Sequence, residues 1–579
     1  MKKLTKMNAE AFKRVIRYLR MHSLLLAVTL VLSVISVGLS LYLPILVGDT
    51  IDNIIGIGNV NFAAVMAIFR KMILMIVVTV VSQWLIGVLN NRVTYAVVKK
   101  IRRDAFEKLM KLPISYIDSH GHGATVSRII ADVDTFSEGL LLGLTQLFTG
   151  IITILGTLVF MLTLDVRIAL IVVVLTPLSM LVSKFIASRT FSLFRKQAEA
   201  REVQTSLTEE VITNAKTVKA FAMEDEMCER FENCNEELRS ISLKATFYSS
   251  LVNPSTRFVN GIIYAVVAFA GAVSGISAGG LTCFLGYANQ YTKPFNEISG
   301  VITEFQNALA CASRIFELLD EESECENEKT RLPESVNGDV VFENVDFSYT
   351  PTRPLIENFS VRIKAGQKVA IVGPTGCGKT TLINLLMRFY DAKSGAVYLD
   401  GTNVYDVKRR DLRKSYGMVL QDTWIKKGTV AENIALGKSD ATIDEIIDAS
   451  KAVHAHSFIK RLPCGYDTVI SDESSALSQG QRQLISIARV MLCRPTVLIL
   501  DEATSSIDTR TEAKIQSAFD KLTEDRTSFI VAHRLTTIKN ADVILVMKDG
   551  SVVETGSHDE LLRKGGFYRE LYESQFPKG

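Results

Sequence analysis

The chain of 579 residues exceeds one ordinary hydrophobic core, so several domains are expected. Its hydrophobic content of 48% and mean hydropathy of +0.22 are high for a wholly soluble protein. The net charge of +3 is too small to indicate nucleic acid as a partner, and the eight cysteines form no C-x-x-C pair that would indicate a zinc site or a disulfide framework.

Long runs without charge in the N-terminal half predict helices that cross a membrane. Leu24 to Val47, Met72 to Leu89 and Gly139 to Leu164 are uncharged, and each is long enough to span a bilayer. Ile168 to Ser183 is shorter, but it follows the third run after a tight turn at Asp165. The number and length of these runs argue against the buried core helices of a soluble protein.

A further uncharged stretch, Phe258 to Thr292, is divided by the glycine-rich segment Gly275 to Gly280 into a fifth span and the beginning of a sixth. Arg257, Lys293 and Glu297 interrupt this region, and they either line an aqueous cavity or lie on extensions outside the membrane. The predicted helices cover residues 24–47, 72–89, 139–164, 167–187, 250–273 and 281–310 of a transmembrane domain formed by residues 1–320.

The distribution of lysine and arginine predicts the orientation of these spans. Basic residues are concentrated before the first span and in the connections after the second and the fourth, whereas Gly48 to Phe69 contains none. Because basic connections remain on the cytoplasmic side, the N-terminus and the chain after the sixth span are predicted to be cytoplasmic. The first span is too long for a signal peptide and lacks a small-residue cleavage site, so a multi-pass protein of the cytoplasmic membrane is expected.

The segment before the first span predicts an amphipathic helix. Phe12, Val15, Ile16 and Leu19 lie on one face of it. Such a face suits a helix that lies in the membrane interface, and it equally suits packing against a neighbouring helix. The long connections after the second and fourth spans are charged but periodic, which predicts that the spanning helices continue beyond the membrane.

The composition changes after the sixth span. Residues 321–337 are acidic and polar and predict a linker. From residue 338 to residue 579, short apolar strands alternate with helical segments, a pattern typical of α/β domains.

The segment Gly373 to Thr380, GPTGCGKT, fits the phosphate-binding loop pattern G-x-x-x-x-G-K-[ST]. It follows an apolar strand, Lys368 to Val372, and precedes a helical segment. A glycine turn that matched the pattern by chance would lack this flanking strand and helix. Backbone N–H groups of the loop favour phosphate oxygens, Lys379 can reach the β- and γ-phosphates, and the Thr380 hydroxyl can ligate Mg²⁺. The predicted ATP-binding residues here are Gly373, Pro374, Thr375, Gly376, Cys377, Gly378, Lys379, Thr380 and Thr381.

Cys377 lies inside this loop, just before the predicted helix. A thiol at a helix N-terminus tends to have a lowered pKa, which predicts a reactive cysteine whose modification by a maleimide blocks ATP hydrolysis. The alternative is a small, unreactive residue that only fills space.

A second apolar strand ends in two carboxylates. Thr496 to Leu500 is followed by Asp501 and Glu502. We expect Asp501 to hold Mg²⁺, usually through water, and Glu502 to orient and polarise the attacking water. Two acids at a strand end indicate little by themselves, but with a phosphate-binding loop upstream they indicate a nucleotide hydrolase.

Leu477 to Gln481, LSQGQ, resembles the LSGGQ signature of ATP-binding cassette (ABC) proteins. Other residues that follow the family pattern are Tyr349, Gln421, Ser505 to Asp508, and His533. The six-span half before this domain resembles the membrane half of ABC exporters. The resemblance covers nearly the whole chain and implies a half-transporter, in which a membrane α-helical six-span exporter domain is fused to an α/β P-loop ATP-binding cassette domain.

The resemblance implies that two cassettes bind ATP head to tail. Tyr349 would stack on adenine, and the segments Tyr116–Ala124 and Ala215–Phe221 would dock on the cassettes, the second on the opposite subunit. The implied residues are Glu502, His533, Lys379 and Gln421 for catalysis, Thr380, Gln421 and Asp501 for Mg²⁺, and Ser478, Gln479, Gly480 and Gln481 for the ATP of the partner.

The chain departs from the family pattern at the signature. Gln479 replaces the usual first glycine, and Ile470 to Ser475 lacks the Glu-Arg-Gly type of ending common in homodimeric exporters, whereas Glu502 and His533 are intact. This combination resembles one member of a heterodimeric exporter, in which this chain supplies the catalytic carboxylate of the competent site. A homodimer that tolerates the glutamine is the alternative.

The resemblance implies ATP-driven export of amphipathic small molecules, with ATP and Mg²⁺ as cofactors and a second half-transporter and membrane lipid as partners. A lipid or lipid-linked flippase with the same ATPase is the alternative. Soluble cassette ATPases lack membrane spans, and importers usually carry permease and cassette on separate chains.

Overall fold

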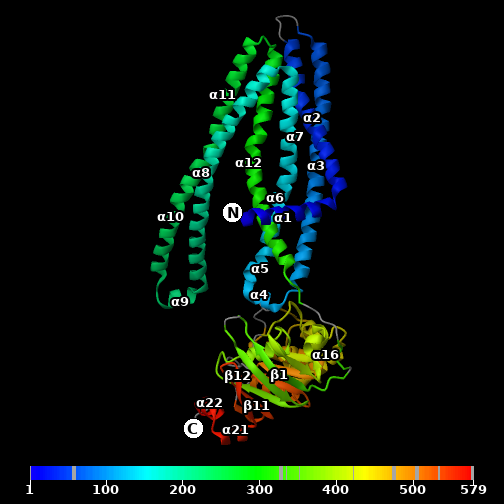
Figure 1. The fold of residues 1–579 in the computed structure, drawn as a ribbon, viewed down its shortest axis with the longest axis vertical. Helices are drawn as coiled ribbons and strands as arrows, with labels where there is room; N and C mark the ends of the chain where they lie inside the picture. The colour runs from blue at the N-terminus through cyan, green and yellow to red at the C-terminus, as the bar shows by residue number, and fades with distance from the viewer. Residues whose placement is uncertain are drawn as a thin grey trace. The chain divides into compact units, whose positions relative to one another are not determined.

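The computed structural model describes residues 2–54, 60–324, 330–333, 335–350, 353–420, 423–471, 477–501, 508–531 and 535–575. The chain divides into two compact units, shown in Figure 1. The helical unit comprises Met1–Met110 and Gly121–Glu321, and the α/β unit comprises Lys111–His120 and Glu322–Gly579. The predicted boundaries place Lys111–His120, which follows the second predicted span, in the transmembrane domain. In the structure this short segment belongs to the α/β unit.

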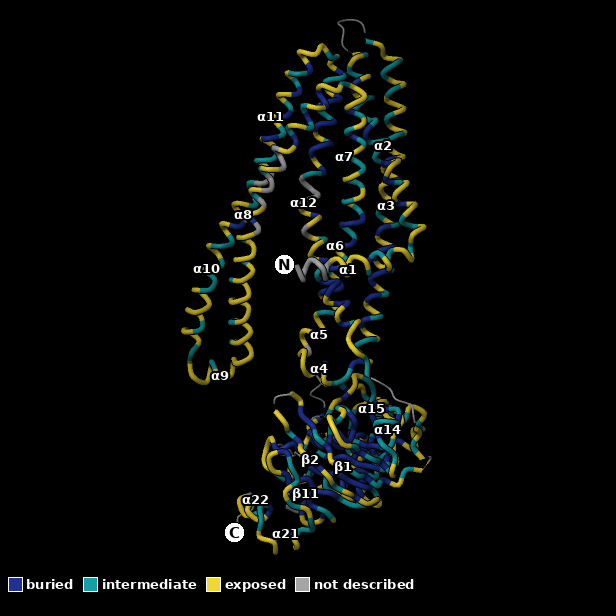
Figure 2. The backbone as a smooth tube through the Cα atoms, viewed as in Figure 1, coloured by how far each residue is buried: buried dark blue, intermediate teal, exposed yellow. Residues whose placement is uncertain are grey.

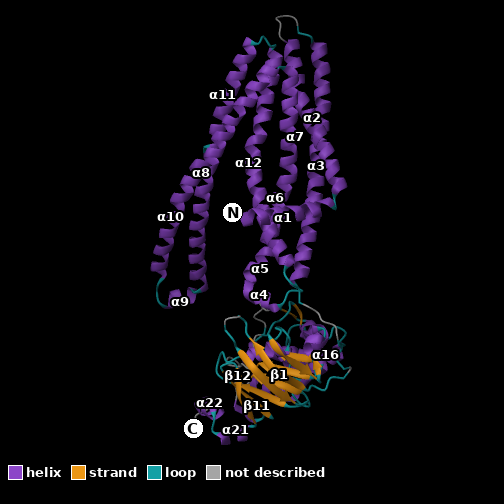
Figure 3. Ribbon diagram, in the orientation of Figure 1, coloured by secondary structure: helices purple, strands orange, loops and turns teal. Residues whose placement is uncertain are grey.

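The helical unit consists of long helices joined by short turns (Figure 3). Its helices are α1 (Lys2–Arg20), α2 (Ser23–Ile54), α3 (Phe62–Leu109), α5 (His122–Ile129), α6 (Ala131–Leu142), the π-helical turn η1 (Gly143–Leu147), α7 (Phe148–Leu164), α8 (Val166–Thr213), α9 (Ala215–Ala220), α10 (Glu224–Ser250), α11 (Val252–Val273) and α12 (Ala278–Asp320). Helices satisfy their own backbone hydrogen bonds, which is why apolar chain crosses a bilayer in this form.

The predicted spans lie within these helices, and most of the helices extend beyond them. Residues 24–47 lie in α2, 72–89 in α3, 139–164 in α6, η1 and α7, 167–187 in α8, 250–273 from the end of α10 through α11, and 281–310 in α12. By length and hydropathy, the described stretches that could cross a membrane are Ser23–Ile54, Phe62–Leu109, Gly123–Leu164 and Glu224–Val273, with Val166–Pro177 as a shorter apolar stretch. The side chain of Glu297, which interrupts the sixth span, lies outside the described residues.

Two tight turns join successive helices of this unit where the sequence predicts them. Asp165 caps α8 by accepting hydrogen bonds from the backbone N–H groups of Arg167 at 2.7 Å and Ile168 at 3.2 Å. Gly275, at φ +70°, follows the end of α11, and the Ser277 side chain caps α12. Each turn reverses the chain with few residues because a side chain satisfies the first donors of the next helix.

Helices α2 and α12 meet at a pair of glycines. A Cβ atom placed on Gly48 would lie 2.7 Å from the carbonyl oxygen of Gly279, so neither backbone leaves room for a side chain. Beside this contact, Asp52 accepts hydrogen bonds from the Ser277 hydroxyl at 2.7 Å and from the Gly279 N–H at 2.8 Å. The first turn of α12 is therefore held against the end of α2 by both packing and charge-assisted hydrogen bonds.

Ion pairs hold the other end of α12 against α6 and α1. Arg314 of α12 donates to both oxygens of Asp132 of α6, at 2.8 and 2.5 Å, and Asp132 is only 9% exposed. Arg14 of α1 donates to both oxygens of Asp320 of α12, each at 2.6 Å. Bidentate geometry fixes the direction of the guanidinium as well as its distance, so these pairs set how α1, α6 and α12 meet.

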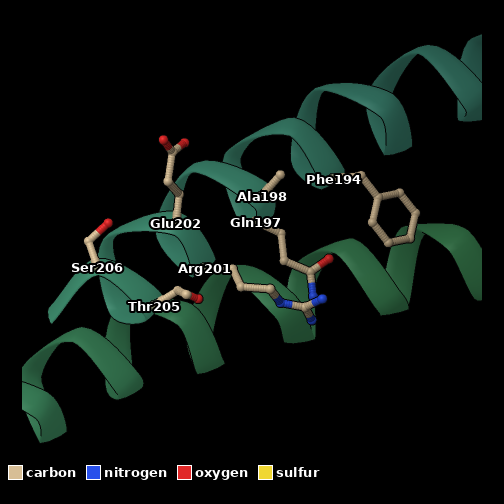
Figure 4. A pocket seen from close by; sticks show the side chains of 7 residues that line it. All are labelled: Phe194, Gln197, Ala198, Arg201, Glu202, Thr205 and Ser206. Atoms are coloured by element: carbon tan, nitrogen blue, oxygen red, sulfur yellow. The ribbon is translucent and has the colours of Figure 1, made fainter. Parts of the chain in front are cut away.

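Helices α8 and α10 form a long pair, much of which is exposed (Figure 2). Gln197 of α8 donates to the Ser242 hydroxyl of α10 at 2.8 Å. Phe221 after α9 is 74% exposed and Ile212 of α8 is 69% exposed. A hollow of about 520 Å³ on this pair, shown in Figure 4, is lined by Phe194, Gln197, Ala198, Arg201, Glu202, Thr205 and Ser206.

The α/β unit contains three sheets in its described residues. The antiparallel sheet has the order β2-β1-β4-β5 and consists of β1 (Val340–Phe347), β2 (Ile356–Ile363), β4 (Ser394–Leu399) and β5 (Thr402–Asn403). The largest sheet has the order β12-β11-β3-β10-β9-β6 and consists of β3 (Lys368–Val372), β6 (Tyr416–Val419), β9 (Val497–Asp501), β10 (Thr527–Val531), β11 (Val543–Lys548) and β12 (Ser551–Gly556). The pair β7 (Gly428–Thr429) and β8 (Val469–Ile470) forms the third.

Short helices connect or flank the strands of the α/β unit. They are α4 (Ile114–His120), α13 (Lys379–Leu386), η2 (Val404–Asp406), α14 (Arg409–Lys414), α15 (Val430–Ile434), η3 (Ala435–Gly437), α16 (Ile443–Ala452), α17 (His456–Ile459), η4 (Gly465–Asp467), α18 (Gln479–Cys493), α19 (Thr509–Leu522), α20 (Leu535–Lys539), α21 (His558–Lys564) and α22 (Phe567–Gln575). Alternate residues of β9 enter different core clusters: Ile499 packs with Leu382 of α13, whereas Leu498 packs with Leu484 of α18. The sheet therefore separates the helix that follows the glycine loop from the helix that follows the signature.

The glycine contact between α2 and α12 can be tested by adding one methyl group. Gly48→Ala should lower the free energy of unfolding by about 1–3 kcal/mol, because its Cβ would overlap the backbone of Gly279. Thermal unfolding of the purified protein in detergent measures this change. The matched control is Gly38→Ala on the same helix, where no heavy atom lies within 4 Å and the change should be neutral or stabilising. Equal melting temperatures for the two variants would contradict the close approach.

Candidate nucleotide-binding site

The glycine loop starts from an interior strand of the largest sheet. Strand β3 lies between β10 and β11 and pairs in parallel with both, so its position is fixed on two sides. The loop leaves the carboxyl end of β3, turns through Gly376 at φ +83° and Gly378 at φ +102°, and enters α13 at Lys379. Only glycine adopts both conformations without strain, which is the physical reason for glycine at these two places.

The start of α13 is open to an anion. Gly378 stands at the N-cap position and offers no side-chain cap, so the first N–H groups of the helix have no side-chain partner there. The Lys379 ammonium donates to the carbonyl oxygens of Gly373 at 2.7 Å and Pro374 at 3.0 Å. Because these partners are neutral, the positive charge of the lysine and of the helix terminus remains to attract phosphate.

Tyr349, predicted to contact adenine, lies beside this helix. Its hydroxyl donates to the Thr381 hydroxyl at 3.2 Å and accepts from the Asn384 side-chain amide at 3.0 Å. Its side chain is 48% exposed, so one part of the ring is available to another group. The structure thus brings Tyr349, the glycine loop and the first turn of α13 together.

The other predicted catalytic residues follow strands that end at the same edge of the sheet. β9 pairs in parallel with β10 and with β6, and β10 pairs in parallel with β3, so all four strands have their carboxyl ends at one edge. Asp501 is the last residue of β9, beside Val531 at the end of β10. Gln421, Glu502 and His533 come directly after these strands in the sequence, but they lie outside the described residues. Carboxyl ends of parallel strands are where ligands bind in α/β sheets.

The signature segment forms the start of another helix. Ser478 caps α18, and its hydroxyl accepts from the Gln481 N–H at 3.3 Å while the Gln481 side chain accepts from the Ser478 N–H at 3.0 Å. Gly480 is buried, whereas Gln479 is exposed at the first helical position. The substitution of glutamine for glycine therefore leaves the helix start intact and adds a long polar side chain to the surface beside it.

The prediction of a reactive Cys377 is wrong. Its side chain is only 4% exposed and belongs to the core cluster that includes Leu382 and Met547. Burial raises the pKa of the Cys377 thiol above its ordinary value, and this effect outweighs the lowering by the Lys379 charge. Position at a helix N-terminus suggested the opposite shift, but the thiol points into the core rather than toward the loop surface. The alternative, a small residue that fills space, describes it better.

Sequence reasoning missed Tyr390, which follows α13 in the chain and contacts Tyr349. The rings of Tyr349 and Tyr390 meet edge to face with centroids 5.0 Å apart. The Tyr390 hydroxyl donates a hydrogen bond to the Asp118 carboxylate of α4. Burial, followed by the nearby Asp118 charge, raises the pKa of Tyr390, so the hydroxyl stays a donor across physiological pH. Only the prediction that residues near Tyr116 dock on a cassette hinted at this contact.

The described residues fit ATP and Mg²⁺. An uncapped helix start, two left-handed glycines and an ammonium bonded to neutral oxygens form a cradle for a polyphosphate chain. The exposed Thr380 hydroxyl and the Asp501 carboxylate supply the oxygen ligands that Mg²⁺ prefers.

Comparison with known families agrees with both units. A family model described as the ABC transporter transmembrane region matches residues 26–295, and one described as ABC transporter matches residues 356–505. A fatty acid ABC transporter ATP-binding/permease protein of Mycobacterium bovis is 40% identical over 90% of this chain and 83% of its own length. An uncharacterized ABC transporter ATP-binding protein of Bacillus subtilis is 38% identical over 98% of this chain and 94% of its own length. A candidate multidrug export ATP-binding/permease protein of the same organism is 34% identical over 97% of this chain and 99% of its own length.

The buried state of Cys377 predicts slow modification. N-ethylmaleimide near neutral pH should label the exposed Cys228 and Cys464 while leaving Cys377 unmodified, because burial blocks access and the raised pKa keeps the thiol protonated. Labelling should increase only as the pH rises through the raised pKa of the thiol. Peptide mass spectrometry measures each site, and labelling after denaturation shows that the reagent can reach all three. Rapid modification of Cys377 in the folded protein, prevented by ATP, would restore the reactive-cysteine hypothesis.

Proposed function

The chain belongs to the ABC transporter family as an exporter half-transporter with an ATPase coupled to transport, and from this premise we propose that it exports amphipathic small molecules of the multidrug type across the cytoplasmic membrane. The proposal rests on two features that occur in the same chain. One is a phosphate-binding loop at the carboxyl edge of a parallel sheet, and the other is a set of helices long and apolar enough to span a bilayer. Relatives named for multidrug export and for fatty acid transport support a cargo that combines apolar and polar parts. The fatty acid relative also favours the second candidate, a lipid or lipid-linked flippase.

In the proposed mechanism the glycine loop binds the phosphates of ATP. The uncapped N–H groups of α13 and the Lys379 ammonium hold the β- and γ-phosphates, and the exposed ring of Tyr349 stacks on adenine. Thr380, Asp501 and Gln421 hold Mg²⁺, which, when bound, neutralises the charge that develops on the phosphate oxygens. The side chains thus fix the γ-phosphate before hydrolysis begins.

Glu502 is proposed to accept a hydrogen bond from the attacking water and polarise it. His533 holds the γ-phosphate and helps to position Glu502. Both follow strands whose carboxyl ends share one edge with the glycine loop, which supports their assignment to one site.

The second half of each nucleotide site is proposed to come from a partner subunit. ABC half-transporters generally dimerise, and the start of α18, with Ser478 and Gly480, suits an anion supplied by the other cassette. The apolar side chains exposed on the α8–α10 pair support a partner in the same region, because large apolar surfaces on a charged hairpin mark protein contacts. ATP bound between two cassettes would close them, and hydrolysis would release them.

A heterodimer is the proposed assembly. Gln479 adds an exposed side chain where the γ-phosphate of the partner's ATP would approach, which weakens the site that this signature completes. Glu502 and His533 are both present, so the site built on this chain's own glycine loop keeps its catalytic groups. The expected pair therefore has one competent and one degenerate site, and a homodimer is the alternative.

Movement of the cassettes is proposed to reach the membrane helices through α4. Tyr349, at the adenine position, touches Tyr390, and Tyr390 donates to Asp118 of α4. Since α4 follows α3 after a short turn, a displacement of this helix would act on the end of a predicted span. Basic connections on the same side of the predicted spans support a cytoplasmic position for the N-terminus and the ATPase domain.

Substitution of the proposed catalytic carboxylate tests the ATPase assignment. In the assembled transporter, Glu502→Gln should leave ATP binding intact and lower turnover by at least about 100-fold, because the amide cannot polarise the attacking water. Nucleotide binding and phosphate release measure the two effects, and dye uptake by inverted vesicles measures transport. Turnover at the full rate would show that Glu502 has been misassigned, and ATPase stimulation by lipids but not by drugs would replace drug export with the flippase alternative.

The heterodimer proposal predicts poor ATP hydrolysis by this chain alone. Co-purification from the native membrane should recover a second half-transporter, and adding that subunit should restore drug-stimulated activity. Gln479→Gly should raise the activity of the chain alone, because it restores the glycine of the signature. Full drug-stimulated turnover by the purified chain alone would establish the homodimer.

A further inference from the structure

A large apolar cavity lies in the helical unit beneath α1. Its volume is about 750 Å³, within the range of about 300–1,000 Å³ that ligand pockets occupy. One wall is formed by α1, through Phe12, Ile16 and Leu19, and the others by α2, η1, α7 and α12. Residues of the π-helical turn Gly143–Leu147 form part of the cavity wall. Such a turn is an irregularity that often marks a functional position in a helix.

The cavity offers almost no polar partner to a ligand. The Thr29 hydroxyl already donates to the carbonyl oxygen of Leu26 at 2.9 Å, and the Ser33 hydroxyl donates to that of Thr29 at 2.7 Å. The side-chain amide of Asn90 donates to the Thr145 hydroxyl at 3.3 Å. Because these groups are satisfied within the protein, the space favours hydrocarbon rather than a polar molecule.

Helix α1 has the form of a helix that lies in a membrane interface. It crosses the long helices rather than running along them (Figure 1). It is held there by the Arg14–Asp320 ion pair and by stacking of Tyr18 on Phe316, with ring centroids 6.2 Å apart. Its apolar face is turned to the cavity. Amphipathic helices of this kind lie at the boundary between acyl chains and headgroups.

The side of α1 that faces away from the cavity is basic. Arg17 and Arg20 are exposed there, and Lys13 lies one turn earlier near the acidic Glu317 and Asp320. The acidic residues near these arginines include Glu10, two turns before Arg17, and Asp104 of α3, which accepts a hydrogen bond from the Tyr18 hydroxyl at 3.2 Å. Arg17 and Arg20 therefore carry positive charge toward the headgroup layer, where they attract anionic lipids.

We propose that this cavity holds one acyl chain of an anionic phospholipid whose headgroup is bound by Arg17 and Arg20. The lipid is a resident ligand of the helical unit and is separate from the exported cargo. It fills the space between α1 and the π-helical turn, so it completes the packing of α1 against α2 and α7. The positive charge of Arg17 and Arg20 favours an anionic headgroup, and the apolar walls of the cavity favour the acyl chain of the lipid.

Photocrosslinking of the full transporter in lipid vesicles tests the proposal. The probes are phosphatidylglycerol with a diazirine midway along one acyl chain and phosphatidylcholine with the same chain. Mass spectrometry should find the label on cavity residues such as Leu30 and Leu144, about tenfold more from phosphatidylglycerol. Arg17→Gln combined with Arg20→Gln should remove this preference, because each basic side chain near an anionic surface strengthens binding about fivefold.

Two matched variants serve as controls. Ala27→Phe fills the cavity from α2 and should suppress labelling by both probes, whereas Ala265→Phe, at an exposed alanine of α11, should not. Arg230→Gln combined with Arg239→Gln on α10 also removes two positive charges, but from a helix that does not line the cavity. This variant should leave the preference for phosphatidylglycerol unchanged. ATP hydrolysis in each variant reports that the protein is folded and tests the transport function independently.

Label spread evenly along the lipid-facing helices, and unchanged by Ala27→Phe, would overturn the proposal. Equal labelling by the two lipids in the unmodified protein would do the same, because it removes the role of Arg17 and Arg20. Competition by an exported drug, without a difference between the lipids, would assign the cavity to cargo and also overturn it.

Discussion

The common direction of four strands is the constraint on which the nucleotide site depends. Because β3, β6, β9 and β10 run parallel, the residues that follow each of them meet at one edge of the sheet although they lie far apart in the sequence. The glycine loop and Asp501 stand at that edge by this rule alone. The sheet then divides the core, so that α13 packs on one face and α18 on the other. This separation of α13 from α18 supports the proposal that the signature serves a glycine loop on another cassette.

The α/β unit also carries its own connection to the rest of the chain. Tyr349, Tyr390 and Asp118 form a line of contacts that ends at α4. Each contact depends on direction, because one is an edge-to-face ring pair and the other is a hydrogen bond to a carboxylate. Contacts of this kind break when one member shifts by a small distance, whereas apolar packing tolerates such shifts. With Tyr349 as the proposed contact of adenine, this line would respond to nucleotide binding.

The helical unit is rigid at its ends and open near α1. The glycine contact with Asp52 holds one end of α2 and α12, and the Arg314–Asp132 and Arg14–Asp320 pairs hold α1, α6 and α12 at the other. Between these fixed points, the π-helical turn and the face of α1 leave a space that protein side chains do not fill. The hydrocarbon of a lipid can fill such an apolar space favourably, whereas water there would lack hydrogen-bond partners.

The sequence by itself determined the elements that depend on local pattern. Uncharged runs located the long helices, Asp165 and Gly275 located turns, and the order of strand, glycine loop and helix located the phosphate cradle, because hydropathy, capping and glycine geometry act over a few residues. Tertiary structure alone decided which way Cys377 points, and its burial reversed the predicted pKa shift. It alone joined Tyr390 to Asp118, which are 272 residues apart, and opened the cavity under α1. These features depend on contacts between elements that lie far apart in the sequence. A local sequence pattern cannot predict them, because they form only when the separate elements pack together.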